Sequence, residues 1–265
     1  MITNLNDIVR AFSTKQVFYP LKYTPGASSA VIGYWNSSWR TPGSNLAEIP
    51  PTGSGEACGA STLGRVMIND AGPAKELYMS RLLFSPSAAV GCYVMDRLVH
   101  TSGLSGTITT AQAVNTVALP SRANNGEGAE IWLEWYVTTG ATARIVTVTY
   151  TNSNNVTGRT ATVSLPVSVR ATSTIRVPLQ AGDTGVKSVQ TVSLNGSTGT
   201  AGNFGVTIAN RISTIDNVVA NAFSAMGPIG LNLPKVANGS CLYFIVNSAA
   251  TTAASYDLEM TIIEG

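Results

Sequence analysis

The fold is decided by two neighbouring segments, Ala129-Glu-Ile-Trp-Leu-Glu-Trp-Tyr-Val137 and, after the turn sequence TTGAT, Arg144-Ile-Val-Thr-Val-Thr-Tyr150. Along the first segment, one face carries Ile131, Leu133 and Trp135, and the other carries Glu130, Trp132, Glu134 and Tyr136. Alternation with a period of two residues is typical of a β-strand, because successive side chains point to opposite faces of a sheet. We therefore expect two antiparallel strands, with the second running back along the first.

Similar segments recur on both sides of this pair, spaced about 8–12 residues apart and bounded by residues that favour turns. Those expected to be strands are 77–84, 91–99, 108–110, 160–165, 174–179, 186–194, 204–209, 241–246 and 256–263. The connector SPSAAV between the first two has the length of a hairpin loop. The pattern predicts an all-β fold: an antiparallel, jelly-roll-like β-sandwich over residues 63–212, completed by a C-terminal segment, 213–265.

Residues 1–62 predict a different role. Four apolar residues at helical spacing, with Asn4 or Asn6 as the cap, predict one short helix within residues 1–14. An expected strand, 30–35, leads into a loop over 36–62, and a loop of that length usually has a function or contacts a partner. We therefore expect an N-terminal arm and long loop. Its expected contact residues are Leu5, Ile8, Val9, Phe12, Tyr34, Trp35 and Trp39.

The composition limits the classes of function. Of the 265 residues, 11% are charged and 44% are hydrophobic, and the formal net charge is +2, so the chain has enough apolar residues to fold around a core. It contains no run of basic residues, which argues against nucleic-acid binding. It also lacks a stretch of about 18 apolar residues, which argues against a membrane span. A surface with so few charges predicts that partners cover part of it.

Groups that carry out catalysis are scarce. His100 is the only histidine, and although Asp96 would share its strand face, no serine on a sharp turn completes a triad. Glu130 and Glu134 would stand about 13 Å apart along one strand, which is too far for glycoside hydrolysis. Another strand could bring Glu127 or a further carboxylate closer, but a solvated sheet face is the simpler interpretation. We predict that the chain is not an enzyme.

Signals for a metal or a cofactor are equally weak. The glycines of 53–59 lack the spacing of a phosphate-binding loop, and Asp183, between glycines, fits a turn better than a calcium site. Three widely spaced cysteines form neither a disulfide framework nor a metal motif, so we expect Cys58, Cys92 and Cys241 to be small buried side chains. A sugar-binding aromatic platform is the alternative to sheet packing for Trp132, Trp135, Tyr136 and Tyr150. No catalytic, cofactor-binding or metal-binding residue is predicted.

Several stretches resemble a known family. They are MITNLNDIVRAF at 1–12, Gly33-Tyr-Trp35, Cys92-Tyr-Val-Met-Asp-Arg-Leu98, Val148-Thr-Tyr-Thr-Asn152, Gly158-Arg-Thr160, and the segments 177–186, 188–190 and 198–206. Together they are similar to a family of tailed-bacteriophage virion structural proteins over most of residues 1–210, whereas 213–265 resemble no part of it.

The resemblance implies a structural role, and we expect a protein that decorates or cements the capsid. The expected partners are the major capsid protein and further copies of the chain, as a homo-oligomer such as a trimer, with no direct contact to nucleic acid or membrane. The expected location is the capsid surface of the virion, after synthesis in the cytoplasm of the bacterial host. A tail or neck protein, and a virion protein that binds host carbohydrate, are the alternatives.

Overall fold

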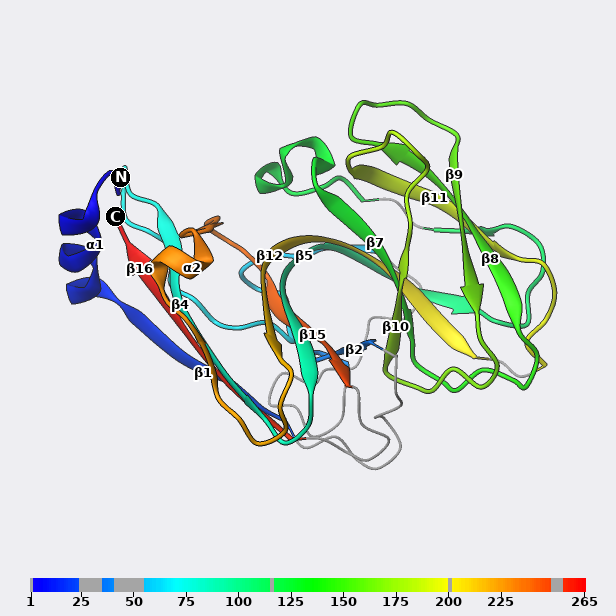
Figure 1. Ribbon diagram of the computed structural model, residues 1–265. Coiled ribbons are helices and arrows are strands. Elements are labelled where there is room, and N and C mark those ends of the chain that lie inside the picture. The colour runs from blue at the N-terminus through cyan, green and yellow to red at the C-terminus, as the bar shows by residue number, and fades with distance from the viewer. Residues whose placement is uncertain (1, 24–34, 41–54, 115–116, 200–201, 249–254) are drawn as a thin grey trace.

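The fold is mostly β, as the sequence predicts. The computed structural model describes residues 2–23, 35–40, 55–114, 117–199, 202–248 and 255–265 (Figure 1). Strands account for 50% of the chain and helices for 9%. The strand pairs in the described ranges are antiparallel, which confirms the expected all-β, antiparallel class. Among the described helices, none has the length and apolar character needed to cross a membrane.

Six strands close into a barrel at the centre of the molecule (Figure 1). The strand order is β12-β7-β10-β2-β15-β5, and β5 pairs back onto β12 to close the ring. A short strand, β3 (Gly55–Ala57), adds to β5. The six barrel strands are β2 (Trp35–Ser37), β5 (Val90–Ser105), β7 (Ala129–Trp135), β10 (Ser173–Val177), β12 (Asn203–Asn217) and β15 (Leu242–Ser248).

Two further sheets flank the barrel on opposite sides (Figure 1). The one near both chain ends, which we call the terminal sheet, contains β1 (Gln16–Tyr23), β16 (Tyr256–Glu264), β4 (Leu77–Pro86), β13 (Ser224–Met226) and β14 (Lys235–Val236). The other, the distal sheet, contains β6 (Gln112–Ala113), β11 (Val186–Leu194), β8 (Arg144–Asn152) and β9 (Arg159–Leu165). The helical elements are α1 (Leu5–Ala11), η1 (Phe12–Thr14), η2 (Ser121–Gly126) and α2 (Pro228–Leu231).

The longest strands, β5 and β12, connect the three layers. In β5, Cys92 and Val94 point to the core under the terminal sheet, while Tyr93 and Met95 point into the barrel. Further along the same strand, Leu98, Val99 and Leu104 join the core under the distal sheet. The pairing of β5 with β12 shifts register in three places, and such bulges bend and twist a strand pair. One strand pair can therefore serve two cores that lie on opposite sides of the barrel.

Within the described residues the expected strands are found, with one exception and two corrections to their pairing. The strand expected at 30–35 lies outside the described residues apart from Trp35, the first residue of β2. Residues 108–110 do not form a strand. The two expected hairpins are wrong: β4 and β5 lie in different sheets, and so do β7 and β8. The reason is burial on both faces, because β7 has a buried residue at every position but one. A strand buried on both faces needs a covering layer, and the next strand along the chain belongs to that layer.

The three expected segments interleave in space. Residues 1–62 supply α1 and β1 to the terminal sheet and β2 and β3 to the barrel, while residues 41–54 of the expected long loop lie outside the described residues. Residues 213–265 supply β15 to the barrel and three strands to the terminal sheet. The expected helix is present. Asn4 caps α1 by accepting the N–H of Asp7, whose carboxylate accepts the N–H of Asn4 in return.

Candidate functional site

The barrel interior holds a connected set of polar side chains. Glu134 of β7 accepts hydrogen bonds through Oε1 from Thr207 Oγ1 (2.7 Å) and Trp39 Nε1 (3.3 Å). The ring of His100 on β5 lies between Thr207 Oγ1, 2.8 Å from Nδ1, and the hydroxyl of Tyr136, 2.7 Å from Nε2. Strands β5, β7 and β12 are neighbours in the barrel wall, so residues far apart in sequence meet in one chain of hydrogen bonds.

Burial determines the protonation states of the residues in this series of hydrogen bonds. It raises the pKa of Glu134, and together with the charges of Arg97 and Arg40 it lowers the pKa of His100 well below 6.5. His100 is therefore neutral at pH 7. We assign its Nδ1 as the donor to Thr207 and its Nε2 as the acceptor from Tyr136, because the Thr207 hydroxyl proton is already donated to Glu134.

Two arginines complete the interior. The guanidinium of Arg97 lies 3.9 Å from the centre of the Trp39 ring and donates through Nη2 to the carbonyl of Leu63 at 2.6 Å. The guanidinium of Arg40 lies 4.0 Å from the centre of the Tyr136 ring. Aromatic faces attract such cations, so the rings replace part of the solvation lost on burial. Glu134 Oε2 and Arg97 Nε and Nη1 have no hydrogen-bond partner among the described residues.

These residue types can move protons, but three of them are closed off from solvent, while Tyr136 and Arg40 are half-buried. His100 and Arg97 are each 1% exposed and Glu134 is 2% exposed. A buried polar network of this kind fixes strand register and specifies one packing arrangement. The hydrogen bonds of this network therefore help to hold the strands of the barrel together.

The sequence interpretation of these residues needs three corrections. Glu130 and Glu134 share a face of β7 as expected, but that face lines the barrel and is not solvated: Glu130 pairs with Arg176 (3.1 Å) and Arg211 (2.6 Å). Asp96 and His100 do not share a strand face as expected, because Asp96 points out of the barrel to Arg122 while His100 points into it. An expected contact residue, Trp39, is 3% exposed and lies inside the barrel, so it offers no outer surface. Large aromatic residues on the polar face of β7 were the signal that this face is buried.

Outside the barrel, Asp96 and Arg122 form a buried ion pair that borders a pocket of about 460 Å³. Arg122 Nε lies 2.8 Å from Asp96 Oδ2. The remaining charged residues of the pocket wall are also paired, Lys235 with Glu76 (2.7 Å) and Lys75 with Glu264 (3.1 Å). The pocket therefore has no unpaired charge in its described wall to attract an ionic ligand.

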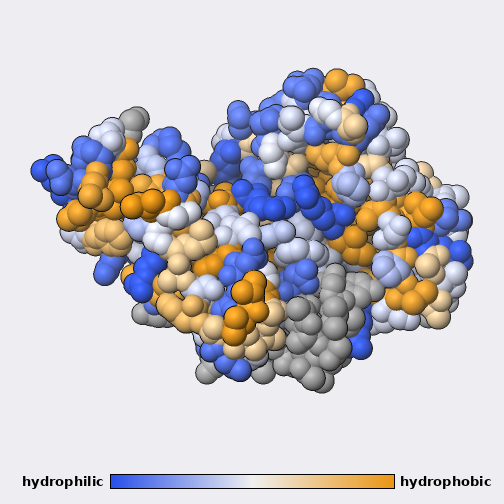
Figure 2. All heavy atoms as spheres, viewed as in Figure 1, coloured by the Kyte–Doolittle hydropathy of each residue, from blue (hydrophilic) through white to orange (hydrophobic). Residues whose placement is uncertain are grey.

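Exposed apolar side chains are unevenly distributed over the outer surface. Eight large apolar side chains of the described residues are at least 59% exposed. All eight lie on the terminal half, which we define as the terminal sheet with its helices and connecting segments. Figure 2 shows apolar side chains gathered over α1, at the end of the molecule that carries both chain ends. The eight are Leu5, Val9, Leu63, Met67, Val218, Val219, Phe223 and Ile229.

The other expected contact residues divide by orientation. Leu5 and Val9 of α1 point outward, at 68% and 65% exposed, whereas Ile8 and Phe12 pack under the helix against the terminal sheet. Trp35 is half-buried and stacks on Tyr93 with ring centres 4.2 Å apart. Tyr34 lies outside the described residues.

Besides Leu63 and Met67, four exposed residues of the terminal half were missed by sequence reasoning: Val218, Val219, Phe223 and Ile229. They belong to a stretch, 213–238, that fits no simple periodicity. The available signal was the pair Val218-Val219 between polar residues, next to turn-forming Asn221.

The remaining expectations concern binding sites. Trp132, Trp135 and Tyr150 are fully buried, so the aromatic residues form no sugar-binding platform. The carboxylate of Asp183 is occupied by Tyr150 (2.5 Å), Asn152 (2.7 Å) and Arg159 (2.9 Å), in keeping with a turn residue. Within the described ranges, no group of three or more potential metal ligands comes together. The three cysteines are free and buried, as expected.

Comparisons of the chain with protein-family models, with curated proteins and with solved structures found no match.

Proposed function

We propose that the chain is a structural subunit of a tailed-phage virion that attaches to the major capsid protein through its terminal half, as a decoration or cement protein. The observation that carries the proposal is the concentration of exposed apolar side chains on that half, with Ile229 at 92% and Val218 at 85% exposed. Exposed apolar residues scattered singly are normal, whereas their concentration on one region is typical of a protein interaction site.

Two further features support the proposal. The resemblance to virion structural proteins includes residues 1–12, which contain the two outward-facing residues of α1. His100 and Glu134 are enclosed in the barrel, so their polar atoms serve the packing of its strands. We also propose that the distal sheet and the barrel wall on which it packs are the two layers of the jelly-roll-like sandwich expected from the sequence.

A binding experiment with matched variants tests the proposal. The wild-type chain is incubated with empty capsids of its phage, sedimented and quantified, alongside Val218→Asp/Ile229→Asp on the terminal half and Val156→Asp/Val167→Asp on the distal half. We expect saturable binding of the wild type and of the distal variant. The terminal variant should bind at least roughly tenfold more weakly, because each new carboxylate would lose its hydration in the contact.

Equal binding by both variants would place the contact elsewhere on the chain. Failure of the wild type to bind capsids would overturn the capsid role, and purified tails and necks would then be tested in the same way. A second pair of substitutions, Leu5→Asp/Val9→Asp, separates the α1 part of the surface from the part at 218–229. Light scattering of the free protein reports whether the same substitutions also disrupt a homo-oligomer.

A further inference from the structure

Two cysteines meet at one edge of β5. Strand β12 pairs along the whole of β5 on one side, so β3 and β15 both pair with its other side, one after the other. Cys58 directly follows β3 and donates its N–H to the carbonyl of Leu98 (2.9 Å). Cys241 directly precedes β15 and accepts the N–H of Arg97 through its carbonyl (3.0 Å). Residues 58 and 241 thus stand beside adjacent residues of β5, on the same edge.

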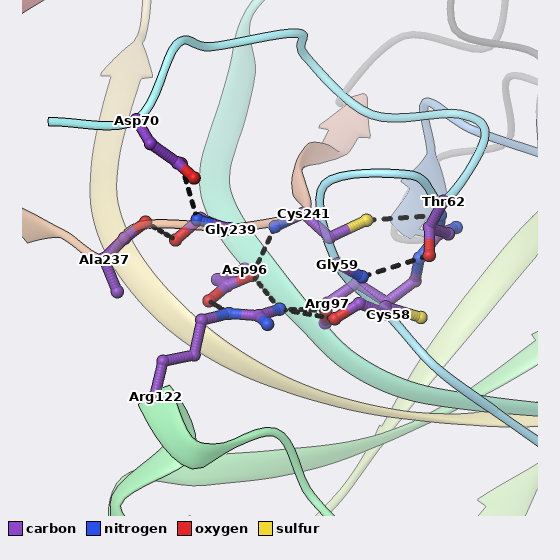
Figure 3. A network of polar contacts seen from close by, with 11 residues as sticks. Cys58, Gly59, Thr62, Asp70, Asp96, Arg97, Arg122, Ala237, Gly239 and Cys241 are labelled. Atoms are coloured by element: carbon purple, nitrogen blue, oxygen red, sulfur yellow. Dashed lines mark hydrogen bonds and ion pairs between the residues drawn. The ribbon is translucent and has the colours of Figure 1, made fainter.

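A single ion pair holds both cysteine backbones in place (Figure 3). Arg122 Nη2 donates to the carbonyl of Cys58 at 2.8 Å, and Asp96 Oδ1 accepts the N–H of Cys241 at 2.8 Å. Asp96 and Arg122 bind each other, and their side chains are 5% and 10% exposed. The two cysteines are therefore fixed relative to each other by the barrel wall and by this buried pair.

The side chains of Cys58 and Cys241 lie close to the positive charge of Arg97. Arg97 directs Nη2 to Cys241 Sγ at 3.4 Å, as Figure 3 shows. The neighbouring Cys58 thiol and the nearby Arg97 charge lower the pKa of Cys241 to about 7, while the neighbouring Cys241 and burial raise the pKa of Cys58. A thiolate on Cys241 also supplies a negative charge to Arg97, whose guanidinium is 1% exposed and lacks a carboxylate partner among the described residues.

We propose that Cys58 and Cys241 are an oxidative modification site that forms an intramolecular disulfide. The geometry has what this reaction needs: two adjacent thiols, one of them activated by a cation. With glutathione disulfide as the oxidant, the Cys241 thiolate attacks one of its sulfurs, which forms a mixed disulfide and releases one glutathione thiolate. Cys58 then loses its proton and attacks the Cys241 sulfur, which releases the second. The protein gives up two electrons and the oxidant becomes two glutathione molecules.

Access requires local opening, because Cys58 is 1% exposed and Cys241 is 0% exposed. The segment after β3 is the part able to open, since β3 pairs over only three residues. Once formed, the disulfide would fix this segment to β15, and cross-linking positions so far apart in the sequence stabilises a fold. Cys92 takes no part, because it lies in the core under the terminal sheet.

The test counts thiols in the folded full-length protein. Reduced protein is incubated with glutathione disulfide in low, non-denaturing urea, alkylated after full denaturation, and analysed by intact mass and peptide mapping. We expect one alkylated thiol in place of three, a peptide pair joined through Cys58 and Cys241, and a melting midpoint raised by about 5 °C or more. Cys92→Ser should react as the wild type does, whereas Cys58→Ser and Cys241→Ser should form no internal disulfide.

The outcomes separate cleanly. Three free thiols after an incubation that oxidises an exposed control dithiol completely would overturn the proposal. So would a disulfide that includes Cys92, or glutathione bound to Cys241 without closure onto Cys58. Because the decisive measurement is made on the wild type, poor folding of a serine variant does not affect the result.

Discussion

The terminal and distal halves share a barrel but present different surfaces. On the distal half, the most exposed large apolar side chain among the described residues is Val167, at 51%. Its ion pair is also more enclosed: the Arg159 side chain is 24% exposed where it binds Asp183, whereas the cations in the ion pairs of the terminal sheet are 50% exposed or more. Exposed ion pairs contribute little to stability. The two halves therefore differ in their surfaces: the distal half has the more enclosed ion pair, and the terminal half exposes its large apolar side chains more fully.

The largest expected effect tests whether the two halves are one folding unit. Trp135→Ala removes a fully buried ring of the distal core, and Phe84→Ala removes one from the terminal core. Each should reduce the free energy of unfolding by about 4 kcal/mol. Because β5 and β12 pass through both cores, calorimetry should show one transition, lowered by either substitution. Two transitions, each sensitive to only one of the substitutions, would show that the halves melt independently.

A smaller effect is expected at the enclosed carboxylate of the distal half. Burial opposes ionisation of Asp183, but hydrogen bonds from Arg159, Tyr150 and Asn152 outweigh it and lower its pKa to about 2, from an ordinary value of 3.8. The ionised group therefore stabilises the fold above about pH 4, and this contribution is lost as the pH falls toward 2. Asp183→Asn should cost about 2 kcal/mol at pH 7, measured by denaturant titration.

The matched control for that substitution is Asp257→Asn, at an exposed position of the terminal sheet. Its cost should stay within about 0.5 kcal/mol. Equal costs at the two positions would remove the distinction between an enclosed and an open polar surface.

The barrel shared by both halves should respond to pH through His100. Its folded-state pKa lies well below 6.5, so the unfolded state binds more protons below that pH and the fold loses stability as the pH falls. The raised pKa of Glu134 acts in the opposite direction, so the difference between wild type and His100→Gln isolates the histidine. We expect a slope difference of up to about 1.4 kcal/mol per pH unit below pH 6. Parallel stability curves would mean that His100 is solvated.

The smallest effect on stability is expected at the exposed apolar residues. Ile229→Lys on the terminal half and Val167→Lys on the distal half should each change the unfolding free energy by no more than about 0.5 kcal/mol. The terminal variant alone should remain soluble at concentrations where the wild type associates, as measured by light scattering. A stability loss at Ile229 would show that this side chain packs within the chain and is not available to a partner.

The positions of most long strands could be predicted from the sequence, although β1 was missed, but the pairing of the strands could not. The alternation in 129–137 correctly separates the residues of the distal core from the other face. What lies against that other face depends on β2, β10 and β15, which are distant in the chain, so Glu134 and Trp39 were assigned to solvent and to a contact surface. The α1 residues were found because a local pattern and cap define a helix. The dithiol was missed because only the register of β3 and β15 on β5 brings the cysteines together.

The β5–β12 pair also has a mechanical consequence. Its hydrogen bonds run across the strand direction, from Asn203 opposite Ser105 to Asn217 opposite Val90, and the pair is anchored in a separate core toward each end. A load applied along these strands strains many of the bonds at once, in shear, and does not open them one after another. If one half of the molecule is attached to a partner that pulls on it, the β5–β12 pair transmits the force to the other half.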